Sequence, residues 1–265
     1  MKEARPSVQT PYPYYAKIDL TNKNNAHTLM IDKVKNGSCV LECGCSGGHM
    51  TQILAQKKCT VDCIEIDKTV ASMVYQFARR VYVTDLENPN FLKTLTNFSY
   101  DFIICGDILE HLRHPNNCLK MLRGKLKPDG RVIASIPNIA HGSVRLKLLK
   151  GRFEYEQSGL LDRSHLKFFD FYSIVELFND TKLHIETFDV VRIPLEHPIA
   201  NIDLSEYEQT IVEQIKQDNT SDIFQYVICA RNMTTPDDLN NTELLYSQID
   251  VPNSYKIKGK DQEIV

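Results

Sequence analysis

The sequence predicts an α/β fold built on an open, mostly parallel sheet with helices on both faces. Short apolar segments suited to buried strands alternate with segments whose apolar residues recur at helical spacing. One apolar segment, residues 39–41, runs into a turn with glycines at positions 44, 47 and 48 and then into a helical pattern. A strand, a glycine turn and a helix form the nucleotide-binding corner of such sheets, where ligands lie at the carboxyl ends of the strands. We therefore expect a ligand site at this turn.

The other elements continue this alternation. A proline- and tyrosine-rich arm over residues 1–15 precedes a predicted helix over residues 22–34. Helical spacing of apolar residues then predicts helices near residues 49–54, 70–77, 112–126 and 204–215. Strands are predicted over residues 60–65, 81–83, 100–106, 131–136, 183–188 and 224–230.

The composition excludes several classes of protein. The chain has 265 residues, of which 42% are hydrophobic and 25% charged, as in an ordinary globular protein. Its formal net charge of −3 gives no basic field to recruit nucleic acid or a membrane. No stretch approaches the length of a membrane span, and residues 1–5 are not followed by an apolar signal core, so we expect a cytoplasmic protein. The eight cysteines lie mostly in apolar runs and are expected to be reduced thiols.

The glycine turn does not fit a dinucleotide. The fingerprint G-x-G-x-x-G, started at Gly44, would require glycine at Ser46 and at His49. An acidic residue two positions before the first glycine suits a ligand with an ammonium group and no pyrophosphate. Glu42-x-Gly44-x-Ser46-x-Gly48 resembles motif I of the class I S-adenosylmethionine-dependent methyltransferases, usually [DE]-x-G-x-G-x-G. A small serine in place of the middle glycine keeps the turn tight.

Later residues extend this resemblance in the expected order. Glu65 ends the second strand, where a carboxylate can accept two hydrogen bonds from a ribose diol. Ile66 follows it and is assigned to the same cofactor site. In the family, an acid after the third strand takes the adenine amino group and the next apolar residue covers the ring. Asp85 and Leu86 occupy these two positions.

The resemblance covers about residues 25–192 and implies a fold and a cofactor. The fold is the Rossmann-like class I methyltransferase fold, a seven-stranded sheet whose last strand is antiparallel. The cofactor is S-adenosyl-L-methionine. It would be held by the turn from Glu42 to Gly48, including Cys45, by the residues after the second and third strands, and by Asp107 after the fourth strand, where the methyl group lies in this family.

Residues 137–146 and 159–169 resemble a bacterial methyltransferase subgroup often encoded with, or fused to, glycosyltransferases. The subgroup implies a saccharide or other small polar acceptor, possibly nucleotide-linked, and an insertion over about residues 138–180 that forms an acceptor lid. We divide the chain into an arm and cover helix over residues 1–30, the methyltransferase domain over residues 31–232 and a flexible tail over residues 233–265. The predicted reaction is O-methylation of such an acceptor.

Histidines are the candidate bases. Methyl transfer from a sulfonium depends mainly on orientation, but a hydroxyl acceptor must also lose a proton, and histidine titrates near neutral pH. Three histidines fall after strands at the carboxyl edge of the sheet or in the insertion: His111, His141 and His165. Asp162 lies three residues before His165 and is expected to orient it. In the structural alternative, Asp162 pairs with Arg163 and pins the lid.

Two further readings of the sequence stay open. Asp107-x-x-Glu110-His111 resembles the E-x-x-E-H group that holds a divalent ion in ubiquinone O-methyltransferases and small-RNA 2′-O-methyltransferases, so the alternative is a metal-assisted enzyme acting on RNA or a catechol-like ring. Aspartate shortens the reach of the first ligand, and we predict no metal. The other alternative is a non-catalytic S-adenosylmethionine-binding partner of a glycosyltransferase. A basic run from Arg145 to Arg152 predicts a solvated helix face or, alternatively, a clamp for a phosphorylated acceptor.

Overall fold

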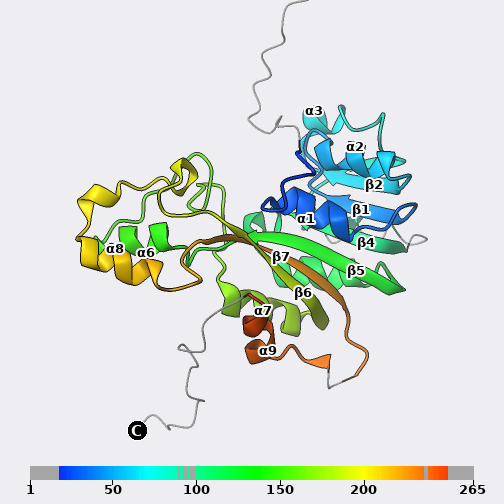
Figure 1. Ribbon diagram of the computed structural model, residues 1–265. Helices are drawn as coiled ribbons and strands as arrows, with labels where there is room; N and C mark the ends of the chain where they lie inside the picture. The colour runs from blue at the N-terminus through cyan, green and yellow to red at the C-terminus, as the bar shows by residue number, and fades with distance from the viewer. Residues whose placement is uncertain (1–17, 89, 92–94, 96–98, 236–237, 250–265) are drawn as a thin grey trace, which may run out of the picture.

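The computed structural model describes residues 18–88, 90, 91, 95, 99–235 and 238–249 (Figure 1). The predicted arm over residues 1–15 lies outside these residues. All eight cysteines are described and all are free thiols, as predicted. Among the described residues, no helix is both long enough and apolar enough to cross a bilayer.

One seven-stranded sheet organises the chain, in the order β3-β2-β1-β4-β5-β7-β6. β7 runs antiparallel to both of its neighbours, whereas β1 to β5 pair in parallel. The predicted fold, with its antiparallel last strand, is therefore confirmed. The strands are β1 Cys39–Cys43, β2 Thr60–Glu65, β3 Arg80–Val83, β4 Tyr100–Gly106, β5 Leu126–Pro137, β6 Leu183–Arg192 and β7 Ile223–Asn232.

Helices cover both faces of this sheet. Because successive strand residues point to opposite faces, Val40 packs in one apolar layer and Leu41 in the other. The layer around Val40 includes α1 and α2, and the layer around Leu41 includes α5, α7 and α9. The helices are α1 Ala26–Lys33, α2 His49–Gln56, α3 Lys68–Ala71, α5 Pro115–Arg123, α6 Gly142–Leu149, α7 Phe171–Asp180, α8 Gln209–Lys216 and α9 Thr242–Gln248, with short 3-10 helices η1 Leu109–His111, η2 Pro198–Ala200 and η3 Leu204–Glu206.

The insertion after β5 is shorter than the predicted lid over residues 138–180. Helix α7 belongs to the core instead, because its Phe171, Ile174 and Phe178 are buried against the sheet. Its start is fixed by a capping box between Asp170 and Ser173. The insertion therefore ends before α7.

A second insertion, between β6 and β7, packs on the first. It carries α8, which lies beside α6 in a lobe beyond the end of the sheet (Figure 1). Ion pairs join and stiffen this lobe, and they use every cation of the basic run that would form a phosphate clamp. The pairs are Arg145–Asp218, Lys147–Glu156, Lys150–Glu206 and Arg152–Glu206.

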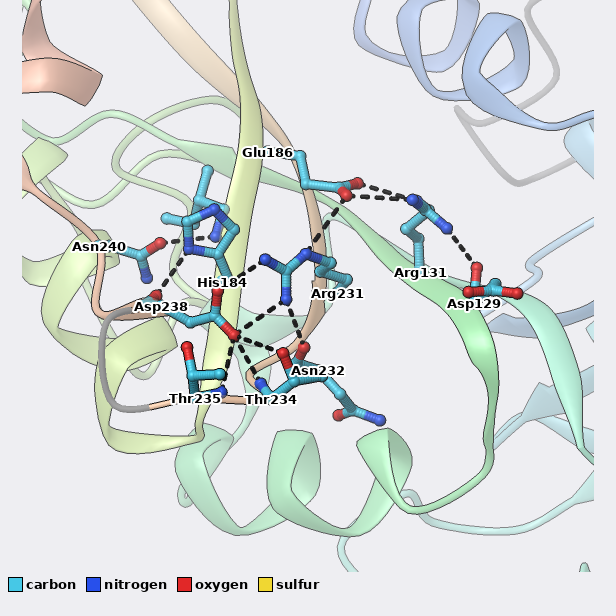
Figure 2. Close-up of polar contacts among 11 residues, drawn as sticks. Asp129, Arg131, His184, Glu186, Arg231, Asn232, Thr234, Thr235, Asp238 and Asn240 are labelled. Carbon is cyan, nitrogen blue, oxygen red and sulfur yellow. Dashed lines mark hydrogen bonds and ion pairs between the residues drawn. The ribbon is translucent and has the colours of Figure 1, made fainter.

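Polar contacts fix the chain after β7 to the opposite end of the sheet (Figure 2). The guanidinium of Arg231 donates to the Asp238 carboxylate at 2.7 Å. That carboxylate also accepts from the backbone N–H groups of Thr234 and Thr235. Glu186 on β6 lies between Arg131 and Arg231 and pairs with both. These contacts hold Arg231, Thr234, Thr235 and Asp238 near β5 and β6.

Part of the predicted flexible tail is therefore folded. Helix α9 follows the polar contacts, begins after the capping residue Asn241, and buries Leu245 and Ile249 in the layer that contains α7. The polar composition of this segment hid a helix with few apolar anchors, which also include Tyr246 against Phe171. Residues 250–265 lie outside the described residues.

Candidate active site

The glycine turn after β1 adopts left-handed backbone conformations that explain its composition. Gly44 has φ of 69° and Gly48 has φ of 81°, and Ser46 between them also has a positive φ of 46°. A Cβ atom on Gly44 would lie 2.0 Å from Cδ1 of Ile108, in the segment after β4. The turn is thus packed against the loop of the neighbouring strand, because β1 and β4 are paired in parallel.

Glu65 connects this turn to the end of β2. One of its carboxylate oxygens accepts from the backbone N–H of Ser46 at 2.9 Å, and the other accepts from that of Asp67 at 3.0 Å. A carboxylate offers about four lone-pair sites, so two sites stay available for the hydroxyls of a ribose. The next side chain, Ile66, is 69% exposed and lies open to a ligand at the same edge.

The motif position of Glu42 predicts a contact with the cofactor, but its side chain is not open to a ligand. Its side chain is buried beneath the turn, where one carboxylate oxygen accepts from the hydroxyl of Thr51 on α2 at 2.6 Å. Burial raises the pKa of Glu42 to about 7, although the hydrogen bond from Thr51 opposes this shift. Cys45 also points inward, into the apolar layer around Val40, so only its backbone can face a ligand.

The two residues predicted to hold adenine lie after β3. Asp85 is exposed, and its carboxylate accepts from the backbone N–H of Glu87 at 2.8 Å. Leu86 is buried in the apolar layer that contains Leu41. Of this pair, only Asp85 is open to a ligand without a movement of the side chain.

Asp107 lies at the carboxyl end of β4 in a left-handed conformation, with φ of 51°. Its carboxylate accepts from the hydroxyl of Ser135 at 2.7 Å and from the side-chain amide of Gln225. These two partners, on β5 and β7, fix the side chain in an otherwise unfavourable turn. Sequence analysis missed both. The one signal in the sequence was Ser135, a polar residue within an apolar strand segment, which the structure shows to be fully buried.

Glu110, His111 and His165 form a cluster beside Asp107. Their ligand atoms lie within 4.8 Å of one another, and the two imidazole rings are 4.9 Å apart, centroid to centroid. The backbone N–H groups of Leu166 and Lys167 both donate to the carbonyl oxygen of Glu110, which holds the insertion against η1. The sequence motif grouped Asp107 with Glu110 and His111. In the structure, the third member of this group is His165.

Backbone carbonyl groups set the tautomers of the two histidines. Nδ1 of His111 lies 3.2 Å from the carbonyl oxygen of Ser164, and Nδ1 of His165 lies 3.3 Å from that of Leu160. Because a carbonyl oxygen only accepts, Nδ1 carries the proton in each neutral ring and Nε2 keeps its lone pair. Burial, together with the nearby His111, lowers the pKa of His165 and favours its neutral, basic form.

The Glu110 carboxylate is buried without a hydrogen-bond partner on either oxygen. Its side chain is only 1% exposed, and burial raises its pKa well above the ordinary value. A buried polar group without a partner is costly, so such groups often mark a site for a ligand, ion or proton. At Glu110 this cost falls beside two histidines.

His141 is a structural residue, contrary to its assignment as a candidate base. It is fully buried at the start of α6, where Nδ1 accepts from the backbone N–H of Ser143 and Nε2 lies 2.8 Å from the carbonyl oxygen of Ile193. Both ring nitrogens are therefore engaged. The contact to Ile193 joins the two insertions.

Asp162 does not orient His165 through its carboxylate. That carboxylate accepts from the backbone N–H and the hydroxyl of Ser164, and His165 contacts only the backbone carbonyl of Asp162. The alternative ion pair with Arg163 is likewise absent from the ion pairs of the described residues. Asp162 shapes the loop that carries His165.

The family described as methionine biosynthesis protein MetW matches residues 24–205, which is more than half of the chain. The chain belongs to the MetW family. The matched part of this MetW protein contains the glycine turn, Glu65, Asp107 and the whole cluster around Glu110.

Curated relatives of this MetW protein are methyltransferases that act on oxygen. The mitochondrial ubiquinone biosynthesis O-methyltransferase of Schizosaccharomyces pombe is 25% identical over 108 residues, which is 38% of each chain. That of Haemophilus ducreyi is 27% identical over 138 residues, 46% of this chain and 58% of the relative. The chain therefore spans about two fifths to three fifths of the length of these relatives.

Solved structures share the fold at low identity. A putative methyltransferase from Bacillus halodurans has a TM-score of 0.55 at 14% identity, over 78% of this chain and 97% of the other. The 1,6-didemethyltoxoflavin-N1-methyltransferase of Burkholderia thailandensis, with bound S-adenosylhomocysteine, has a TM-score of 0.50 at 13% identity, over 81% of each chain. These likenesses confirm the class I methyltransferase fold. The matched proteins are methyltransferases, and one of them holds S-adenosylhomocysteine. They agree with the enzyme class and the cofactor that the sequence predicts.

Glu110→Gln is expected to raise the free energy of unfolding at pH 8 by about 1–3 kcal/mol, because glutamate must bury an unpartnered charge or take up a proton on folding, and glutamine does neither. The folded pKa of Glu110 lies well above its ordinary value of 4.5. The stability that Glu110 contributes is therefore fully present at pH values below its pKa in the unfolded state. It is lost as the pH rises through its pKa in the folded state. Urea unfolding with a chelator, at several pH values from 5 to 8, measures the difference from wild type.

Glu154→Gln, at an exposed position of the same insertion, serves as the control and should leave the profile unchanged. Glu42 is present in all three proteins, so its own titration cancels in the comparison. A Glu110→Gln protein that is less stable than wild type at pH 8 would show that the carboxylate is stabilising where it lies.

Proposed function

We propose that this protein transfers a methyl group from S-adenosylmethionine to a hydroxyl oxygen of a sugar or other small polar acceptor. The observation that carries the proposal is the proximity of two features at one sheet edge. The glycine turn with Glu65 follows β1 and β2, and the cluster of Glu110, His111 and His165 follows β4, the strand paired with β1. Gly44 and Ile108 bring the two loops into contact.

The bound cofactor supplies a methyl group already activated by its sulfonium. The residues of the chain orient it and remove a proton. Glu65 and the turn hold the nucleoside end, and Asp107 lies between them and the cluster. With the cofactor bound, Nε2 of His165 would take the proton of the acceptor hydroxyl as that oxygen accepts the methyl group, and S-adenosylhomocysteine would be the other product. The neighbouring Glu110 carboxylate stabilises the imidazolium that results.

Two observations support an oxygen acceptor of this kind. The curated relatives named above are O-methyltransferases. A neutral imidazole with a free Nε2 is a base suited to a hydroxyl, whose proton must leave during transfer. The sugar itself rests on the resemblance of residues 137–146 and 159–169 to methyltransferases encoded with glycosyltransferases. A nucleotide-linked sugar has less support, since the cations of the basic run are paired with carboxylates.

Calorimetric titration is expected to give one binding site for S-adenosylmethionine and none for NAD. Glu65→Ala should weaken binding of S-adenosylmethionine by roughly 10- to 100-fold, because it removes hydrogen bonds to a charged acceptor. Glu65→Gln, which keeps one acceptor oxygen, should bind with intermediate affinity, and Glu154→Ala should bind like wild type. Equal affinity in wild type and both Glu65 variants, or comparable binding of NAD, contradicts the assignment of the cofactor site.

A second candidate function, metal-assisted O-methylation, is favoured by the buried carboxylate of Glu110. Its oxygens have no partner, and one ring nitrogen each of His111 and His165 lies within 4.8 Å of a carboxylate oxygen. A carboxylate and two imidazoles whose Nδ1 atoms donate to carbonyl groups are a donor set suited to a divalent transition metal. These three side chains would hold the ion, which supplies Lewis-acid activation of a hydroxyl.

Titration with Mn²⁺ separates the two candidates. If the cluster holds a metal, Mn²⁺ binds at a single site, and Glu110→Gln and His165→Ala each weaken it by more than roughly tenfold. Glu154→Gln, an exposed acid of the same insertion, should leave binding unchanged. Calorimetry and the electron paramagnetic resonance spectrum of bound Mn²⁺ report the result. Binding that is absent, or that survives Glu110→Gln, leaves proton removal by His165 as the role of the cluster.

A further inference from the structure

A cavity of about 430 Å³ opens next to Asp107, between α1 and the second insertion. Its volume falls within the range of small-molecule sites. Segments far apart in the sequence line it: the start of α1, the end of β6, η2 and the start of β7. The lining includes His27, Arg192, His197, Ile199, Phe224 and Gln225.

The cavity is joined to the active site through Gln225. This side chain lines the cavity and also donates its amide to the carboxylate of Asp107. Asp107 in turn lies next to η1, which carries Glu110 and His111. A molecule in the cavity would therefore be separated from Asp107 only by the side chain of Gln225.

The wall of the cavity is fixed by contacts between distant segments. The side chain of Asn24 accepts from the backbone N–H of Arg192 at 2.8 Å and donates to its carbonyl oxygen at 2.7 Å. This pair of bonds holds the start of α1 to the end of β6. The cavity is preformed, as sites that bind small molecules usually are.

The charge of the lining indicates the kind of ligand. Arg192 is the one charged residue among those described that line the cavity, and its guanidinium is already engaged by the Asp222 carboxylate and by the carbonyl oxygens of Asn219 and Ile249. A phosphate would find no unpaired cation there. An acceptor bearing a phosphate or a nucleotide is thus disfavoured.

The remaining lining suits hydroxyl groups on an otherwise apolar body. Nδ1 of His197 accepts from the backbone N–H of Ile199, so its Nε2 carries a proton and can donate. His27 and Gln225 add further polar groups, while Phe224 and Ile199 offer apolar surface. Sites with a few polar groups set among apolar ones orient a small neutral ligand.

We propose that this cavity holds the body of an uncharged, hydroxyl-bearing acceptor, such as a neutral glycoside, while its reacting hydroxyl reaches the cluster of Glu110, His111 and His165. This inference rests on the proposed function. It adds the location of the acceptor and the exclusion of charged acceptors. Both can be tested before the natural acceptor is known.

Saturation-transfer NMR on the full chain, saturated with S-adenosylhomocysteine, tests the proposal with methyl glycosides of glucose, mannose and rhamnose and with glucose 1-phosphate. At least one methyl glycoside should bind, and glucose 1-phosphate should bind more weakly. Ile199→Trp fills the cavity from an exposed position and should weaken glycoside binding at least tenfold. Leu244→Trp, an equally exposed position on α9, should have no effect.

Calorimetry with S-adenosylhomocysteine on each variant separates this proposal from the proposed function. Unchanged cofactor binding with loss of glycoside binding in Ile199→Trp alone supports the cavity. No glycoside binding to a cofactor-loaded protein, tighter binding of glucose 1-phosphate, or glycoside binding that survives Ile199→Trp overturns it. If the wild-type protein does not bind S-adenosylhomocysteine, the proposed function itself is refuted.

Discussion

The hydrogen bonds of Glu65 are the constraint on which the site depends. They hold a turn with three left-handed residues against the end of β2, and the turn in turn packs on Ile108 after β4. Parallel pairing of β1 with β2 and β4 puts the ends of all three strands at one edge. A ligand held by the turn therefore lies beside the residues that follow β4.

The chemistry at this edge comes from the missing hydrogen-bond partners of the Glu110 carboxylate. Buried polar groups nearby are satisfied: Glu42 by Thr51, Asp107 by Ser135 and Gln225. Glu110 alone among these acids is buried with both oxygens unpartnered, next to two imidazoles with their Nε2 lone pairs available. Stability lost at Glu110 is consistent with a group that is kept for function.

Sequence patterns predicted the sheet and the glycine turn well, because apolar strands and a left-handed glycine turn leave local signatures. They predicted less of the acceptor side. Gln225 contacts Asp107 only because β5 pairs with β7. His165 lies beside Glu110 only because of how the insertions fold. Whether both nitrogens of a histidine are bonded is likewise set by distant residues, which is why His141 resembled a base. Polar composition similarly hid α9.

The most direct test of the account is a crystal structure of the protein with S-adenosylhomocysteine. We predict that the ribose hydroxyls bind the Glu65 carboxylate and that the nucleoside lies along the turn from Gly44 to Gly48. The sulfur atom should face Asp107 and the cluster of Glu110, His111 and His165. A cofactor bound at the same turn with its sulfur directed away from this cluster would contradict the proposed reaction site. A cofactor bound elsewhere would contradict the account as a whole.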